Sequence, residues 1–105
     1  MVNLFEMDYN DSDLDAVRRV LERGTWWTQG PEIEEFEKAL AQCHGRQYCT
    51  VFNSGTTALI ALLSSIDCSP HAEVIVPSYT FIATANAVLW ASLKPVFADI
   101  EAETF

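Results

Sequence analysis

The sequence predicts an α/β protein with a mainly parallel sheet flanked by helices. In the second half, short β-branched or apolar runs at residues 47–52, 73–77 and 96–100 alternate with apolar helical patterns at residues 56–65 and 81–91. Such alternation is typical of βαβ units, whose strands run parallel. Two amphipathic helical patterns precede this part. A chain of 105 residues has room for one domain at most.

The first 45 residues are expected to form two helices. Ser12 and Asp15 have the spacing of a capping box at the start of the first helix, and Gly24 is a natural stop. Pro31 suits the first turn of the second helix, which should end at residues 44–45. Apolar residues recurring at helical spacing predict the buried face of the second helix: Ile33, Phe36, Leu40 and Cys43.

The loop between these helices, residues 25–30, has an unusual content. Trp26 and Trp27 are adjacent in it and are costly to leave in water. One interpretation is that they anchor the loop against the core or against a second chain. The other is that the loop lines a pocket, with Thr28 and Gln29 as polar contacts, because loops often carry function. The residues alone leave both open.

Residues 51–59 run from a predicted strand through a polar turn into a helix. A helix start presents free N–H groups and a favourable dipole, so it can seat a phosphate. Gly55 has no Cβ and allows an anion to approach the main chain closely. Additional hydroxyl donors come from Ser54, Thr56 and Thr57. The alternative is that Asn53 or Ser54 simply caps the helix.

The remaining elements are predicted from apolar runs and from the proline, threonine and turn residues at their ends. A buried parallel strand over residues 73–77 ends at a proline, and Thr80 can cap a helix over residues 81–91. A turn over residues 93–95 leads into the last strand, residues 96–100. The helix over residues 56–65 is apolar nearly all round, which predicts deep burial.

Two of the polar turns follow strands, where α/β sheets bind their ligands. Residues 53–56 follow the first predicted strand and residues 78–81 the second. Together they place a phosphate seat and an aromatic ring at one end of the sheet, which suits a flat, phosphorylated ligand. For Phe81 itself, the alternative is a core aromatic.

Composition excludes several kinds of partner. The net charge of -9 argues against nucleic acid and against an anionic membrane surface. No apolar run is long enough to span a bilayer, and the first six residues lack the regions of a signal peptide, so we expect a cytoplasmic protein. Three irregularly spaced cysteines match neither a disulfide framework nor a closed zinc pattern, and we assign no metal site.

Four segments, taken together and in order, resemble a known family. They are residues 24–32, 53–59, 73–81 and 95–100. The set resembles the start of the DegT/DnrJ/EryC1/StrS aminotransferases, which depend on pyridoxal 5′-phosphate (PLP) and act on sugars. The resemblance covers nearly the whole chain and departs only in the loop shape at residues 69–72.

The resemblance implies a fold and domain boundaries. The chain would be the incomplete N-terminal part of a PLP-dependent transferase large domain, aspartate aminotransferase-like and of fold type I. Residues 1–45 would supply two helices and the tryptophan loop. Residues 46–105 would supply a β-α-β-α-β unit with the phosphate-binding turn.

It also implies roles for individual residues. The PLP phosphate would be held by Gly55, Thr56 and Thr57, and Phe81 would stack on the pyridine ring. Thr28 and Gln29 would lie near the substrate side of the pocket. The implied activity is amino transfer from an amino-acid donor to a nucleotide-linked keto sugar, in a homodimer.

No catalytic residue is assigned, because neither lysine matches the family's Schiff-base lysine. Lys38 lies on the acidic second helix and Lys94 precedes the last strand, whereas the family's lysine comes much further along the chain. We therefore expect a partial aminotransferase that is inactive alone; some relatives are dehydratases with histidine in place of that lysine.

Two alternatives to an enzyme remain. One is a small α/β module that binds a phosphate or nucleotide without catalysis, although the dinucleotide and P-loop glycine patterns are absent. The other is a non-functional gene fragment or truncated reading frame.

Overall fold

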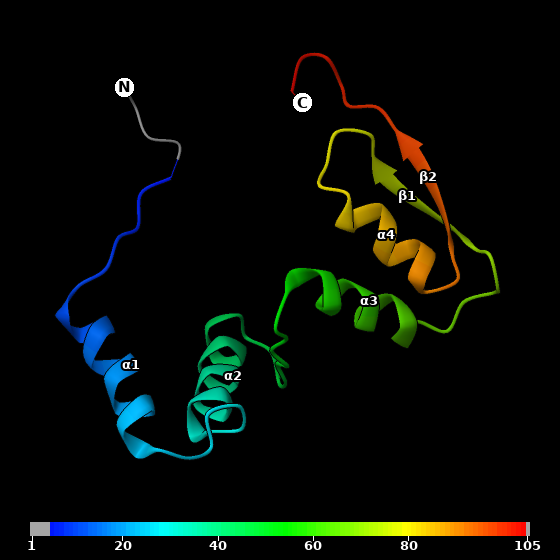
Figure 1. Cartoon of the computed structure of the whole chain (residues 1–105). Coiled ribbons are helices and arrows are strands. Elements are labelled where there is room, and N and C mark those ends of the chain that lie inside the picture. Colours follow the sequence, from blue (N-terminus) through cyan, green and yellow to red (C-terminus); the bar gives the residue numbers. More distant parts are fainter. Residues whose placement is uncertain (1–4, 105) are drawn as a thin grey trace. The chain divides into compact units, whose positions relative to one another are not determined.

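The computed structural model describes residues 5–104. Residues 1–4 and residue 105 lie outside the described residues. The first four belong to the start that lacks signal-peptide features in the sequence, and residue 105 is the last residue of the segment 46–105. The chain divides into two compact units, residues 1–49 and 50–105. The elements in chain order are α1 (Asp11–Arg23), α2 (Pro31–Cys43), α3 (Gly55–Ser65), β1 (Glu73–Pro77), α4 (Ala83–Trp90) and β2 (Lys94–Ala98) (Figure 1).

The first unit contains α1, which begins at Asp11 with a capping box formed by Asn10 and Asp13. The Ser12 N–H donates to Asn10 Oδ1 at 2.8 Å, and the Asn10 N–H donates to Asp13 Oδ2 at 2.8 Å. The predicted box of Ser12 and Asp15 was wrong, because asparagine caps as well as serine and Asp13 already occupies the third helical position. Asp15 instead pairs with Arg18 at 2.7 Å.

The other helix ends in this unit follow the sequence prediction. Gly24 closes α1 in the left-handed region, with φ of 70°, where glycine has no Cβ penalty. Gly30 caps α2, Pro31 occupies its first turn and His44 ends it. Proline fits there because its missing N–H has no intrahelical acceptor to lose.

The predicted buried face of α2 is not buried in this chain. Phe36 and Cys43 are exposed, and in α2 only Ala41 is buried. The apolar face of α1 is also exposed, at Leu14, Val17 and Leu21. The physical reason is that α1 and α2, as far as the structure describes their unit, do not pack on each other, so each amphipathic stripe keeps its face in water.

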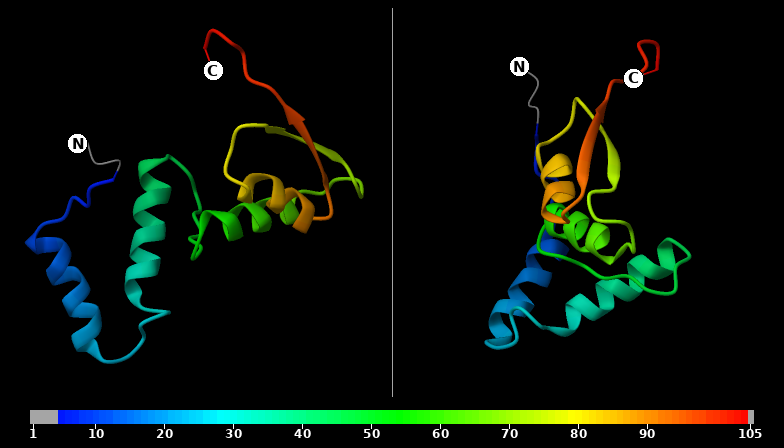
Figure 2. Two further views of the ribbon diagram at one scale, coloured as in Figure 1. Left: turned by 45° about the horizontal axis from the view of Figure 1, so that its top comes forward. Right: turned by 90° about the vertical axis from the view of Figure 1, so that its right-hand side faces the viewer.

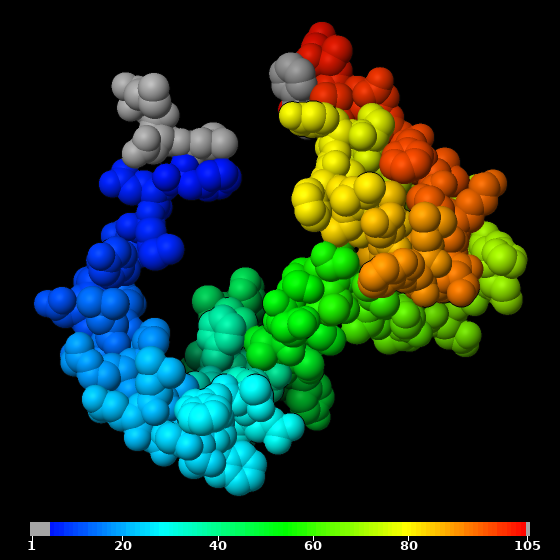
Figure 3. Space-filling view, viewed as in Figure 1, coloured from blue at the N-terminus to red at the C-terminus, as the bar shows by residue number. Residues whose placement is uncertain are grey.

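The tryptophan loop lies at the surface of its unit. Trp26 and Trp27 are each 64% exposed, and the loop residues, in cyan, are visible at the surface in Figure 3. Burial in the core of their own unit is therefore excluded. Contact with a second chain and lining of a pocket both remain predictions.

The second unit is a small layered α/β arrangement. β1 and β2 pair in parallel, in a register that runs from Glu73 opposite Lys94 to Pro77 opposite Ala98. α4 packs on this sheet and α3 packs on α4, as both views of Figure 2 show. The core lies between α4 and β1, where Val88 is 1% exposed and packs with Val76 and Leu93. The predicted parallel pairing is thus confirmed.

Several boundaries and one element differ from the sequence prediction. Residues 47–52 form no strand; a strand needs a paired neighbour, and β1 and β2 pair with each other. β2 begins at Lys94 because the parallel register extends through residues 94–95. α4 begins at Ala83, with Ile82 as N-cap and no capping side chain.

The deep burial predicted for α3 was wrong. No residue of α3 is buried, and Leu62 is exposed. Among the described elements only α4 packs against α3, so one face of the helix is covered and the rest keeps its apolar side chains in water.

The core predicts a contrast between two neighbouring residues of α4. Val88→Ala removes buried methyl groups and should lower the free energy of unfolding by about 2 kcal/mol. Leu89→Ala is the matched control, because Leu89 is 55% exposed, and it should change stability by less than about 0.5 kcal/mol. Urea unfolding followed by circular dichroism measures both; equal effects would contradict the position of the core.

Candidate functional site

α3 begins with a capped turn, and the cap accepts only some of the backbone N–H groups of that turn. Ser54 is the N-cap, and its hydroxyl oxygen accepts the N–H of Thr57 at 3.2 Å. The Ala58 N–H donates to the Ser54 carbonyl oxygen at 3.1 Å. The capping interpretation is therefore correct for Ser54.

Capping nevertheless leaves two amides open. Within the described residues, the N–H groups of Gly55 and Thr56 have no hydrogen-bond acceptor. They are the first two N–H groups of the helix, where the positive end of the helix dipole lies. Capping and anion binding are thus compatible here, because they use different amides of the same turn.

Glycine at position 55 is not required by the fold. A Cβ built on Gly55 meets nothing within 4 Å, and the residue does not adopt the left-handed conformation. The space beside its main chain is open to an external group. This open approach is what a phosphate oxygen needs to reach a backbone N–H.

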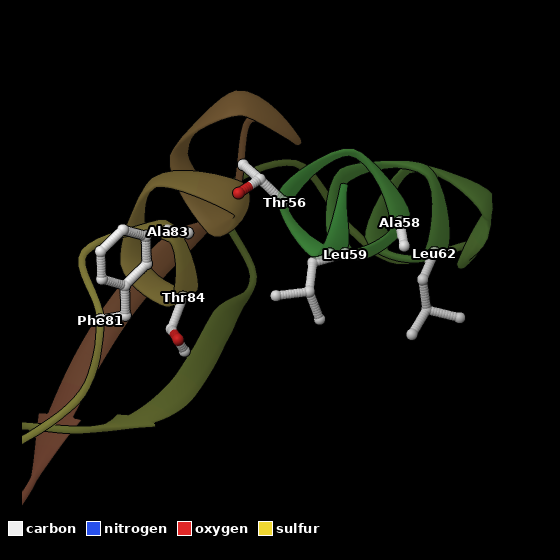
Figure 4. Close-up of a pocket in the computed structure, with 8 residues that line it drawn as sticks. Thr56, Ala58, Leu59, Leu62, Phe81, Ala83 and Thr84 are labelled. Atoms are coloured by element: carbon white, nitrogen blue, oxygen red, sulfur yellow. The ribbon is translucent and has the colours of Figure 1, made fainter. Parts of the chain in front are cut away.

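A pocket of about 610 Å³ lies beside this turn, between α3 and the start of α4. Figure 4 shows the Thr56 hydroxyl directed from α3 toward the start of α4, with the Phe81 ring on the same side. The pocket is lined by Gly55, Thr56, Ala58, Leu59, Leu62, Phe81, Ala83 and Thr84. Its size is within the range of small-molecule sites.

Phe81 is available to a ligand. Its side chain is 76% exposed although it lines the pocket, so it is not a core aromatic of this unit. It precedes α4 and is held by the N–H of Thr84, which donates to the Phe81 carbonyl oxygen at 3.0 Å. Thr80, predicted to cap the helix, instead bonds through its hydroxyl to that of Thr84 at 3.0 Å.

The pocket contains no charged side chain. None of the residues that line it is ionisable, so the positive end of α3 is its main fixed charge. Asp99, at the end of β2, lies outside this lining, and its carboxylate accepts the N–H of Ile100 at 2.8 Å. An anion bound here would be held by backbone donors, without help from a basic side chain of this unit.

The structure brings together three of the six predicted site residues: Gly55, Thr56 and Phe81. Thr57 does not line the pocket; its hydroxyl lies 2.8 Å from Asn53 Oδ1 and 2.9 Å from the Ser54 carbonyl oxygen, so its proton stays within the turn.

Thr28 and Gln29 are exposed residues of the other unit. Their place at a substrate stays a prediction.

Sequence reasoning did not predict that Leu59 and Leu62 line the pocket. Leu59 and Leu62 are spaced three apart after Thr56, which places them along one side of α3, but the all-round apolar pattern gave no reason to single them out. Thr84, whose hydroxyl lies 3.0 Å from that of Thr80 in the segment before α4, was not singled out either.

The fold of the chain is that of the N-terminal part of a fold type I, aspartate aminotransferase-like large domain. The structure is similar to that of an aminotransferase from Psychrobacter cryohalolentis, with a TM-score of 0.79 and 34% identity over 90% of this chain and 24% of that one. The chain belongs to the DegT/DnrJ/EryC1/StrS aminotransferase family, which residues 8–105 match.

Two curated relatives show the range of this family. The 3-amino-5-hydroxybenzoate synthase of Amycolatopsis mediterranei is 35% identical over 92% of this chain and 25% of its own length. The UDP-2-acetamido-2-deoxy-3-oxo-D-glucuronate aminotransferase of Pseudomonas aeruginosa is 39% identical over 88% of this chain and 26% of its own length. This chain spans about a quarter of the curated relatives it matches.

Among residues 5–104, no helix has the length and hydropathy needed to cross a membrane. Within the same residues, no cluster of three or more histidine, cysteine or acidic side chains is placed to hold a metal ion.

The open space beside Gly55 predicts that Gly55→Ala keeps or raises stability. Alanine favours the helix over glycine by up to about 1 kcal/mol, and its methyl group meets no neighbour within 4 Å. Ser54→Ala is the contrast: it removes the cap and should cost about 1 kcal/mol. Thermal unfolding of both variants measures this. A Gly55→Ala variant as unstable as Ser54→Ala would mean that the fold itself needs the glycine.

Proposed function

We propose that this chain supplies the phosphate seat and the ring-stacking side chain of a PLP-dependent sugar aminotransferase. The proposed reaction is amino transfer from an amino-acid donor to a nucleotide-linked keto sugar. The observation that carries the proposal is the pair of open N–H groups at Gly55 and Thr56, beside a pocket that Phe81 lines. Aminotransferases of this family are generally PLP-dependent, and the sugar substrate is proposed from the relatives' activities.

The residues present fit PLP by their chemistry. A phosphate dianion needs N–H donors and a positive helix end, and both occur at the start of α3. The missing Cβ of Gly55 leaves room for its oxygens. Phe81, 76% exposed, offers a ring face to the flat pyridine, and Leu59 and Leu62 give the pocket an apolar wall.

Each residue has a distinct task in this proposal. Gly55 and Thr56 bind the phosphate, and Thr57 contributes by holding the turn through its N–H and hydroxyl. Phe81 orients the ring. When bound, PLP supplies the electron sink that amino transfer requires.

Neither lysine of the chain is suited to the chemical step. The carboxylate of Glu73 raises the pKa of Lys94, and the carboxylate of Glu34 raises the pKa of Lys38. Their ion pairs measure 2.8 Å and 2.6 Å. A nucleophilic lysine is activated by a lowered pKa, and both ion pairs act in the opposite direction. We therefore expect no amino transfer from residues 1–105 alone.

The larger assembly is part of the proposal. We place residues 1–45 and 46–105 as two segments of one PLP-binding large domain, in a cytoplasmic homodimer. The exposure of Trp26 and Trp27 supports a partner surface, because tryptophan is enriched at interfaces and costly in water. Thr28 and Gln29, on the same loop, are proposed to face the substrate.

The phosphate seat and the ring contact can be tested separately by titrating the ¹⁵N-labelled chain. Pyridoxine 5′-phosphate is the probe, because it has no aldehyde to react with lysine amines, and inorganic phosphate reports the seat alone. We expect the amide signals of Gly55 and Thr56 to move with both. Gly55→Ala should weaken both ligands, since its methyl group enters the space of the phosphate oxygens.

Phe81→Leu should weaken pyridoxine 5′-phosphate about fivefold, the equivalent of one aromatic stacking contact, and leave inorganic phosphate unchanged. Phe97→Leu is the matched control, since Phe97 is exposed on β2 and does not line the pocket. Equal loss of both ligands in Phe81→Leu would contradict the ring contact. Tighter binding of ATP than of pyridoxine 5′-phosphate would favour the nucleotide-binding module.

A further inference from the structure

Arg23 is the last residue of α1, where its positive charge suits the negative end of the helix dipole. Its side chain also makes hydrogen bonds that this role does not require. Its Nη1 donates to Glu32 Oε1 at 2.6 Å. Its Nε donates to the Thr25 carbonyl oxygen at 3.1 Å, and its Nη2 donates to the Trp26 carbonyl oxygen at 3.0 Å. One guanidinium thus joins the end of α1, two loop carbonyls and the first turn of α2.

The loop it joins is strained. Trp26 has a φ of 57°, in the left-handed region that a bulky side chain rarely adopts and that costs on the order of 1 kcal/mol. The Trp26 carbonyl is one of the acceptors of Arg23. The arginine therefore stabilises the backbone conformation that the tryptophan itself disfavours.

Gly30 completes the arrangement. A Cβ at this position would approach the Glu32 carboxylate closely, and would lie 2.5 Å from Arg23 Nη2 and 2.9 Å from the Trp26 carbonyl oxygen. The space that a side chain would fill is occupied by the contacts of Arg23. Glycine is therefore favoured here because a side chain would meet the Trp26 carbonyl oxygen, a backbone atom, and would displace the Arg23 and Glu32 side chains that bond around it. At Gly55, in contrast, the space is open.

We propose that Arg23 is a positioning residue that holds residues 24–30 in one conformation, and with them Thr28 and Gln29. The loop's conformation follows from the contacts above, whereas the benefit to a substrate rests on the proposed function. Thr28 and Gln29 lie between the strained Trp26 and the constrained Gly30, so fixing these two positions limits the path of the residues between them. Arg23 needs no contact with a ligand for this role.

The charges around Glu32 support the geometry. Arg23 lowers the pKa of the Glu32 carboxyl below its ordinary 4.5, chiefly by the hydrogen bond from its side chain, with a smaller contribution from the charges of Arg23 and Arg19. A carboxyl with a lowered pKa stabilises the folded arrangement above its ordinary pKa, and the effect is lost as pH falls through the lowered value. The loop should therefore loosen in acid below the normal range of glutamate.

The experiment follows the loop by NMR in the full chain labelled with 5-fluorotryptophan and methyl-labelled threonine. The ¹⁹F signals of Trp26 and Trp27 are assigned by Trp→Phe substitutions. In the native chain we expect the Trp26 signal to shift with a midpoint below pH 4.5, in step with the Glu32 carboxyl. Glu32→Gln should abolish this shift.

Arg23→Gln should move the ¹⁹F signal of Trp26 and the methyl signal of Thr28 to their positions in an unstructured peptide. Arg23→Lys keeps the charge but cannot reach two carbonyls and a carboxylate in one plane, so it should restore only part of the native shift. Arg19→Gln is the matched control: Arg19 lies on the same helix and adds charge near Glu32 but does not bond the loop, and it should leave both signals in place.

A double variant distinguishes positioning from a general effect on helix ends. Gly30→Ala should reproduce the Arg23→Gln signals, and combining the two should add nothing, because both remove the same set of contacts. Additive effects, or unchanged Trp26 and Thr28 signals in Arg23→Gln with α1 and α2 still formed by circular dichroism, would overturn the inference. The titration of the phosphate seat in the other unit is independent of this result, so failure of one does not imply failure of the other.

Discussion

The two amides at the start of α3 are the constraint on which the candidate site depends. A helix start can satisfy its own donors, and here Ser54 satisfies that of Thr57. It does so while leaving the N–H groups of Gly55 and Thr56 open beside an apolar pocket without ionisable groups. The helix dipole adds a partial positive charge at these amides, so a short turn of neutral residues can serve as an anion seat in a chain of net charge -9.

The layered core of the second unit positions the other side of that seat. α4 contacts both strands and α3, and Val88 at its centre is almost fully buried. This packing fixes the direction of α4, so its first turn, with Ala83 and Thr84, lies across the pocket from the start of α3. Phe81, just before that turn, is held at the pocket by the chain geometry while its ring remains exposed. The small core thus positions the residues that line the pocket.

How far the sequence could predict these features depends on whether each is local. The helix ends at Gly24 and Pro31 and the helix start at Gly55 were placed correctly, because helix ends and turns are decided by a few adjacent residues. The roles of Gly55, Thr56 and Phe81 at a ligand stay predictions. The strand at 47–52 and the burial of α3 were predicted wrongly, because both depend on a neighbouring element that pattern alone cannot supply. The contacts of Arg23 were also beyond prediction: its partner Glu32 lies nine residues away, across a loop whose left-handed Trp26 has no sequence signal.

The most direct measurement of the central claim is the ionisation of the phosphate itself. Free phosphate monoesters lose their second proton near pH 6, and N–H donors at a positive helix end favour the dianion. In ³¹P NMR of pyridoxine 5′-phosphate saturating the chain, the account predicts a phosphate pKa below that of the free compound, restored toward it in Gly55→Ala. A bound phosphate whose pKa equals that of the free compound would show that these amides do not hold the dianion, and would contradict the account.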